Sequence, residues 1–148
     1  MPARRLLLVP SLLIVLAGSV PAVAQARTRH DSVVATVHKR AQSGTKVLYT
    51  GTVRSTVFGR GTVRQTVRLR GLRASGRFVI RYARGTIRGT TTAVGRPRLN
   101  RTAVFTGTAR ITGGTGRYAG ARGSGSYSGT SRLDLSSATF RQTGTVRY

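Results

Sequence analysis

The sequence predicts an all-β protein, an eight-stranded antiparallel closed β-barrel, with a β-sandwich as the alternative. From residue 33 onward, apolar residues recur with a period of two rather than 3.6, which is typical of strands. Val, Thr, Ile, Tyr and Phe, which favour strands, recur along the same stretch. Turn residues divide this stretch into about eight runs, and no helix is expected within it.

The first 26 residues are expected to be a signal peptide, preceding the barrel as a helix. Residues 1–5 are basic, residues 6–17 are almost wholly apolar, and small residues around Ala24 fit a cleavage site. The apolar run is too short for a comfortable membrane span, and an uncleaved anchor helix is the alternative. The mature protein is therefore expected to be secreted or otherwise extracytoplasmic, with no membrane partner after cleavage.

Residues 27–148 are expected to form a single barrel domain, in which residues 27–32 are a flexible tail. In each strand that follows, residues that face the core alternate with residues that face water. The expected inward residues are, strand by strand, Val33, Ala35 and Val37; Val47, Tyr49, Gly51 and Val53; Val63, Gln65, Val67 and Leu69; Phe78, Ile80 and Tyr82; Ile87, Gly89, Thr91 and Ala93; Ala103, Phe105, Gly107, Ala109 and Ile111; Tyr127, Gly129 and Leu133; and Phe140, Gly144 and Val146.

Closure into a barrel is favoured over an open sheet. The inward apolar residues are too few to offset alone the entropy of ordering about 120 residues. A closed ladder pairs the backbone groups of every strand and leaves no open edge. Glycine at several inward positions has two interpretations, relief of crowding where strands bend to close a small barrel, or a cavity left by missing side chains.

Charge is the strongest compositional signal. The chain has 26 Lys and Arg against 2 Asp and Glu, a formal net charge of +24, which attracts nucleic acid, anionic lipid or acidic polymers. Six arginines alternate outward from neighbouring strands and would pool on one surface: Arg64, Arg68, Arg70, Arg77, Arg81 and Arg88. No aromatic residues are interleaved among them, so binding to a nonspecific polyanion is expected, and no specific nucleic acid.

Few residues can carry catalysis or hold a metal. The chain has no cysteine or glutamate, its carboxylate side chains are Asp31 and Asp134, and His30 and His38 lack the spacing of metal ligands. No metal and no cofactor is therefore expected. Residues 114–119 match a dinucleotide-binding glycine pattern, but strand-like alternation follows them instead of the required helix. Enzymatic activity is not expected, and an isomerase or cyclase acting on an apolar substrate remains the catalytic alternative.

A glycine-rich stretch, ITGGTGRYAGARG at residues 111–123, follows the sixth expected strand. Gly113 and Gly114 allow positive φ where the strand ends. Tyr118 is the large apolar residue of the stretch and is expected to plug one mouth of the barrel. The expected barrel-mouth turn comprises Gly113, Gly114, Gly116, Arg117, Tyr118 and Arg122.

This stretch resembles the turn of the allene oxide cyclase and dirigent protein superfamily, Gly-Gly-Thr-Gly-x-(aromatic)-x-x-Ala-x-Gly. Residues 57–62 and 78–89 also look like the preceding strands of that group, and the likeness covers roughly residues 47–148. In particular, the chain resembles exported bacterial proteins with an allene-oxide-cyclase-like domain. The resemblance implies an eight-stranded, calycin-like barrel whose interior holds a small apolar molecule.

The catalytic residues of that superfamily do not carry over. Plant cyclases of this type use a glutamate and a cysteine, and this chain has neither. Dirigent proteins use cavity aspartates, whereas here Asp134 is expected to face outward and Asp31 to lie in the tail. The resemblance therefore implies the fold and the turn, and no catalytic residue.

Binding of a small apolar ligand without catalysis is the function that the sequence favours. The candidate pocket residues are the polar or aromatic side chains on the apolar face: Tyr49, Gln65, Tyr82, Tyr127 and Gln142. A buried glutamine needs a hydrogen-bond partner, which a ligand, a water or another strand can supply. Mutual bonding of Gln65 and Gln142 is the alternative. The oligomeric state and the identity of the ligand are left open.

Overall fold

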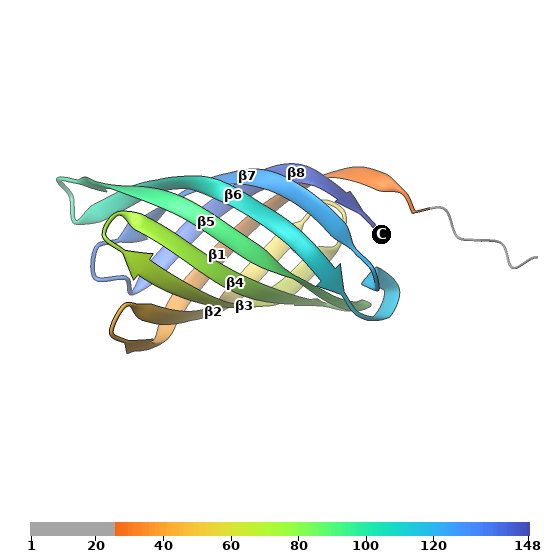
Figure 1. Cartoon of the computed structure of the whole chain (residues 1–148), viewed down its shortest axis with the longest axis horizontal. Coiled ribbons are helices and arrows are strands. Elements are labelled where there is room, and N and C mark those ends of the chain that lie inside the picture. The colour runs from red at the N-terminus through yellow and green to blue at the C-terminus, as the bar shows by residue number, and fades with distance from the viewer. Residues whose placement is uncertain (1–25) are drawn as a thin grey trace, which may run out of the picture.

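Eight antiparallel strands close into a barrel in the computed structural model, which describes residues 26–148 (Figure 1). Each strand pairs with its neighbours in sequence, and the last pairs with the first, which confirms the predicted barrel and excludes the sandwich. The strands are β1 (Thr28–Ser43), β2 (Lys46–Ser55), β3 (Gly59–Arg70), β4 (Arg73–Tyr82), β5 (Gly85–Arg98), β6 (Thr102–Gly114), β7 (Arg122–Arg132) and β8 (Ser137–Arg147). The expected signal peptide, apart from residue 26, lies outside the described residues.

The up-and-down order of the strands places alternate connections at opposite ends of the barrel. The open end carries the turns β1–β2, β3–β4, β5–β6 and β7–β8, at the left of Figure 1. The closed end carries the connections β2–β3, β4–β5 and β6–β7, together with the start of β1 and the C-terminus. The β6–β7 connection contains a short 3-10 helix, η1 (Gly116–Tyr118). Among residues 26–148, no helix has the length and apolar character needed to cross a membrane.

The period-two pattern places side chains on the two faces of the barrel wall as predicted. Strand β7 alternates exposed and half-buried residues along its whole length, and the other strands alternate over most of theirs. Val47, Ile87 and Val146 are among the most fully buried side chains, each on an expected inward position. Every second residue of each strand therefore contributes to the core.

The prediction of a flexible tail is wrong for residues 28–32, because these residues form the first part of β1. They pair with the last five residues of β8, from Thr28 opposite Arg147 to Ser32 opposite Thr143. Their sequence lacks apolar alternation, so the pattern could not reveal the strand, but β8 supplies backbone partners. The carboxylate of Asp31 adds side-chain anchoring by accepting a hydrogen bond from the Ser55 hydroxyl at 2.7 Å.

Inward glycines allow the strands to approach closely. A Cβ at Gly51 would lie 1.9 Å from the Thr36 carbonyl oxygen, and one at Gly107 would lie 2.0 Å from the Thr92 carbonyl oxygen. Relief of crowding is therefore the role of glycine at these positions. Gly95 differs, because the nearest atom to a Cβ there is the Leu72 carbonyl oxygen at 3.7 Å. At this position a Cβ would lie at an ordinary van der Waals distance, so the wall has room for it.

Candidate ligand-binding cavity

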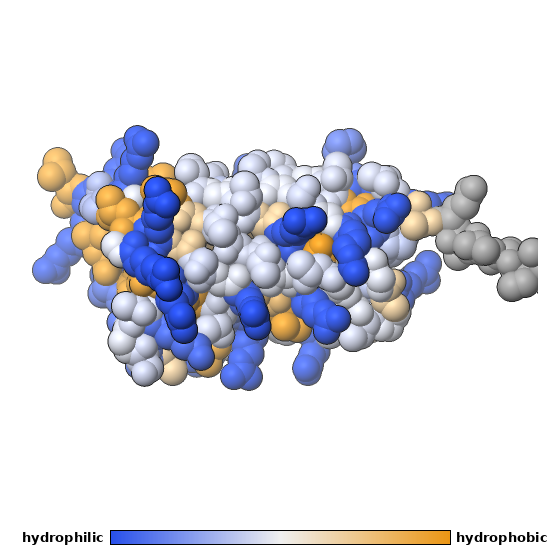
Figure 2. Space-filling view, viewed as in Figure 1, coloured by the Kyte–Doolittle hydropathy of each residue, from blue (hydrophilic) through white to orange (hydrophobic). Residues whose placement is uncertain are grey.

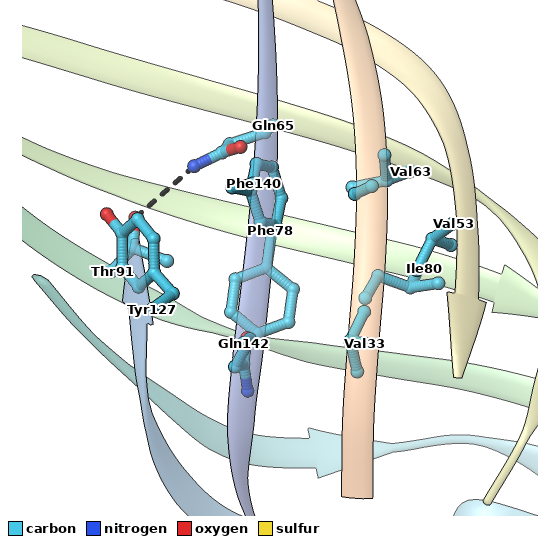
Figure 3. Close-up of a pocket in the computed structure, with 11 residues that line it drawn as sticks. Val33, Val53, Val63, Gln65, Phe78, Ile80, Thr91, Tyr127, Phe140 and Gln142 are labelled. Atoms are coloured by element: carbon cyan, nitrogen blue, oxygen red, sulfur yellow. Dashed lines mark hydrogen bonds between the residues drawn. The ribbon is translucent and has the colours of Figure 1, made fainter. Parts of the chain in front are cut away.

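A cavity of about 220 Å³ reaches into the barrel from its open end. Most of its lining is apolar, including Val37, Val67, Leu69, Phe105, Leu135 and Phe140. A recess of about 30 Å³ continues toward the middle of the barrel and shares Gln65, Tyr127 and Phe140 with the cavity (Figure 3). The barrel thus contains an apolar space with a few polar groups at its inner part.

The closed end is filled by aromatic rings. Phe58 lies at the centre of this group, with ring-centroid distances of 4.8 Å to Tyr118 and 5.2 Å to both Tyr82 and Tyr148. Tyr118 is only 5% exposed. These four residues form the aromatic plug, so Tyr118 does lie in a barrel mouth, at the end opposite the cavity opening.

Three side chains from three strands form a polar cluster in the cavity: Gln65 of β3, Thr91 of β5 and Tyr127 of β7 (Figure 3). The Gln65 amide Nε2 donates a hydrogen bond to the Thr91 hydroxyl at 3.3 Å. Burial raises the pKa of the Tyr127 phenol, and hydrogen bonding with Thr91 partly offsets this rise. The phenol therefore stays protonated at neutral pH and can donate a hydrogen bond to an occupant.

Four of the five predicted pocket residues line the cavity or its recess. Tyr49, Gln65 and Tyr127 line the cavity, and Gln142 lines the recess. Burial, followed by the negative charge of Asp134, raises the pKa of Tyr49. The side chain of Gln65 bonds to Thr91 and not to Gln142, which lies apart from it across the Phe78 ring in Figure 3.

Tyr82 is the predicted pocket residue that the structure does not bring to the cavity. It is the last residue of β4, and this strand ends at the closed end, where the Tyr82 ring packs against Phe58. Burial, followed by the charge of Asp31, raises its pKa. Alternation gives the face on which a residue lies but not its height along the barrel axis, which explains the error.

Several cavity residues were missed as site residues in the sequence. Thr91 occupies an inward-facing position of β5, as predicted, and its polar side chain on that face was the signal for a site residue. Leu72 and Leu133 lie in turns at the cavity mouth, where alternation gives no signal. Leu133 was expected on an inward strand position, but it follows the end of β7 and is 47% exposed.

The glycine-rich turn works differently from the prediction. Gly113 and Gly114 do not adopt positive φ, which instead occurs at Gly116 and Gly120, with φ of 60° and 76°. Gly114 is needed for close packing, since a Cβ there would lie 2.3 Å from the Tyr118 carbonyl oxygen. Arg117 and Arg122 are exposed on either side of Tyr118 at the closed end, with Arg122 Nη1 donating to the Ala121 carbonyl oxygen at 2.9 Å. The turn therefore shapes the aromatic plug and not the cavity mouth.

The six predicted surface arginines lie on three adjacent strands. Arg64, Arg68 and Arg70 are in β3, Arg77 and Arg81 in β4, and Arg88 in β5, and all six are exposed. Strand pairing places Arg64 and Arg88 on either side of Val79 in one row. No carboxylate side chain occurs between residues 59 and 98. We call this outer surface the arginine wall.

Neither carboxylate of the described chain lines the cavity. Asp134 is exposed, as predicted, in the β7–β8 turn. Hydrogen bonds from the Ser136 amide and hydroxyl, and the nearby charge of Arg132, lower its pKa. Asp31 accepts hydrogen bonds from the β2–β3 turn at the closed end. Among residues 26–148, no three histidine or aspartate side chains come together as a metal site.

These features define a class of protein, a closed eight-stranded antiparallel barrel with an apolar internal cavity at one end. No protein-family model matches the chain, and no curated protein matches it. Among solved structures it is similar to the pterocarpan synthase dirigent protein GePTS1, with 11% identity, a TM-score of 0.35, and coverage of 84% of this chain and 86% of that chain.

Proposed function

We propose that this protein binds a small apolar ligand in the barrel cavity without catalysis, and that it does so outside the cytoplasm. The cavity of about 220 Å³ is the observation that carries the proposal. An apolar cavity of about 150 Å³ can hold benzene, whereas pockets for drug-sized ligands measure about 300–1,000 Å³. The expected occupant is therefore a compound of one or two rings or a short acyl segment.

The polar cluster indicates what else the ligand carries. Gln65 and Tyr127 offer hydrogen-bond donors at the inner end of a mostly apolar lining. A buried donor that gains a partner avoids the cost of being left unsatisfied. We therefore expect a ligand with one acceptor group, such as a carbonyl, ether or hydroxyl oxygen, at its inner end.

Filling the cavity provides the test. Gly95→Phe adds a ring at the cavity wall where a Cβ has room, and Thr92→Phe adds the same ring on the outer face of the same strand. With 2-methoxynaphthalene as a neutral two-ring fluorescent probe that carries an ether oxygen, the wild type and Thr92→Phe should bind, and Gly95→Phe should lose at least about tenfold in affinity. Equal binding by all three proteins, or binding by none, would overturn the proposal.

Native mass spectrometry of the exported protein gives an independent readout. Wild-type protein purified from the culture medium should carry a small molecule that is absent from Gly95→Phe. The same spectra report the mass of the mature chain, and cleavage near residue 26 is expected if the leader is a signal peptide. An intact leader on cell-associated protein would contradict the proposed location while leaving ligand binding open to the probe experiment.

The arginine wall favours a second candidate function, nonspecific binding of a polyanion. Six exposed arginines on adjacent strands, with no carboxylate among them, form a surface that attracts phosphate or sulfate groups. Six such contacts to duplex DNA would give a slope of about −5 for log affinity against log salt concentration. Replacing Arg64, Arg77 and Arg88 by Gln should roughly halve this slope, and an unchanged slope would exclude the wall as the binding surface.

A further inference from the structure

We propose that the open end of the barrel docks on an anionic lipid surface, so that the ligand passes between lipid and cavity without crossing water. This inference rests on the proposed ligand binding and names where the ligand comes from. The sequence predicted no membrane partner after cleavage of the leader, because alternation along strands does not show which turns meet at the rim of the cavity.

Exposed apolar side chains gather at the open end. Six large apolar side chains are exposed among residues 26–148, and four of them, Leu72, Val94, Leu99 and Leu133, belong to this end. Leu99 is fully exposed at the tip of the β5–β6 turn. Figure 2 shows apolar and basic residues together at the left end of the molecule, where Figure 1 places these turns. Single exposed leucines are ordinary, but a group of them around one opening indicates an interaction surface.

The turns that carry these leucines are tied to their neighbours by backbone hydrogen bonds. The Gly95 amide donates to the Leu72 carbonyl oxygen at 2.7 Å, and the Leu133 amide donates to the Arg101 carbonyl oxygen at 2.9 Å. The leucines are therefore presented outward on turns that are fixed to the barrel. Holding apolar side chains in water on an ordered support is consistent with a contact surface.

Arginines surround the same opening. Arg70, Arg73, Arg96, Arg98, Arg101 and Arg132 are exposed in or next to the open-end turns, and Arg73 also lines the cavity. Asp134 is the acidic side chain at this end, paired with Arg132 at 3.6 Å. Long basic side chains beside apolar ones suit a bilayer interface, since the stems lie along the apolar region while the guanidinium groups reach the headgroups. Each arginine near an anionic surface strengthens binding about fivefold.

A lipid surface fits this rim better than a nucleic acid or a folded protein does. A nucleic acid would bind the arginines, but it offers no apolar region into which the leucine side chains could insert. The leucines project from three separate turns around a hole, and a fluid bilayer can accept such separate points without a matching shape. Leu72 and Leu133 also line the cavity, so its opening would face the acyl chains when the rim is docked.

A tryptophan reporter tests the geometry directly, because the chain contains no tryptophan. Leu99→Trp places the fluorophore at the rim, and Val79→Trp places it on the barrel wall at a residue that is 46% exposed. With vesicles of phosphatidylglycerol and phosphatidylcholine, Leu99→Trp emission should shift to the blue and be quenched by lipids brominated on their acyl chains. Val79→Trp emission should change little. Equal responses at both positions, or none at Leu99→Trp, would overturn the proposal.

A binding measurement separates docking from general attraction of a cationic protein. In vesicle sedimentation, Leu72→Ser, Leu99→Ser and Leu133→Ser combined should weaken binding at least about tenfold, because three apolar insertions are lost. The matched control, Val34→Ser with Val79→Ser, should bind as the wild type does. Removing rim charge with Arg98→Gln and Arg101→Gln should weaken binding more than Arg64→Gln with Arg81→Gln on the wall. The opposite order would show adsorption through the arginine wall and would exclude docking of the rim.

The failure of this inference is distinguishable from the failure of the proposed function. Leu99 is outside the cavity lining, so Leu99→Ser should retain binding of 2-methoxynaphthalene in the absence of vesicles. Gly95→Phe should lose the probe and still sediment with vesicles. If the leucine substitutions instead change the mass of the protein in vesicle-free solution, the rim contacts a second copy of the chain, and lipid docking is wrong.

Discussion

The two ends of this barrel are built from the same eight strands but finish in opposite ways. At the closed end, the connection from residue 115 to 121 is long enough to fold back and place Tyr118 against Phe58, Tyr82 and Tyr148. At the open end, the turns are short and their leucines point outward over the cavity. The comparison teaches that an end closes where its connections place aromatic rings over the opening, as Phe58 and Tyr118 do, and stays open where its turns carry exposed leucines.

The largest expected effect is the loss of the aromatic plug. Tyr118→Ala removes a buried ring, and truncation of a buried large aromatic residue typically costs about 3–5 kcal/mol. Urea unfolding followed by circular dichroism measures this loss in the free energy of unfolding. Tyr127→Ala truncates a ring that faces the cavity, and it should cost less than half as much. Equal losses would show that the plug is not what distinguishes the two ends.

Two glycines sharpen the comparison between the closely packed wall and the cavity mouth. Gly107→Ala places a Cβ 2.0 Å from the Thr92 carbonyl oxygen, and overpacking of this kind costs about 1–3 kcal/mol. Gly95→Ala places its Cβ 3.7 Å from the nearest atom, so no clash is expected. The free energy of unfolding should be unchanged or higher by about 0.4–1 kcal/mol, because alanine lowers the conformational entropy of the unfolded chain. Chemical unfolding of both variants checks this, and destabilisation by Gly95→Ala would contradict the room for a Cβ found there.

The same two glycines show how much of the fold could be predicted from the sequence. Alternation placed both the strands and their inward faces, since a period of two is local and repeats along each run. It could not distinguish Gly107 from Gly95, because the distance between strands depends on barrel curvature and not on neighbouring residues. The strand at residues 28–32 was missed for a related reason, since its partner β8 lies at the other end of the chain.

The candidate site was predictable in part. Tyr49 and Gln65 were found because they are polar or aromatic residues at strand positions that otherwise carry apolar, inward-facing residues. Both do line the cavity. Tyr82 also occupies an inward-facing position, but it lies at the closed end. Alternation along a strand gives no information about height along the barrel axis, so it could not separate Tyr82 from the cavity residues. The rim leucines were not predicted, because the alternation of inward and outward residues does not extend into turns. Their grouping appears only when turns from distant parts of the chain meet at one end.

The two aspartates lie at opposite ends of the barrel. Asp31 Oδ1 accepts hydrogen bonds from Ser55 Oγ at 2.7 Å and from the Val57 amide at 3.2 Å, which hold the β2–β3 turn at the closed end. Asp31→Ala should lower the free energy of unfolding by about 1.5–3 kcal/mol, the range for hydrogen bonds to a charged group. Asp134→Ala removes a carboxylate at the open end whose hydrogen bonds from Ser136 are exposed to water, so its loss in the free energy of unfolding should be smaller. Similar losses in both variants would contradict the assignment of Asp31 as an anchor of the closed end.

The smallest expected effect appears only at high pH and tests the burial of Tyr82 in the plug. Burial, with a further contribution from the charge of Asp31, raises the pKa of Tyr82 above the ordinary value of 10.0. A phenol whose pKa is raised by folding stabilises the protein fully below that ordinary value, and this stabilisation is lost as the pH rises above it. Between pH 10 and 11, the wild type should therefore lose up to about 1.4 kcal/mol per pH unit through this residue.

Tyr82→Phe keeps the ring in the plug and removes the ionisable group, so its stability should fall less steeply over the same pH range. Tyr49→Phe at the cavity serves as the comparison, because burial also raises the pKa of Tyr49, in a wall that faces the opening. Urea unfolding of the three proteins at stepped pH gives the slopes, and the largest reduction is expected for Tyr82→Phe. A larger reduction for Tyr49→Phe would mean that the cavity excludes water better than the plug does, and the contrast between the two ends would then have to be reversed.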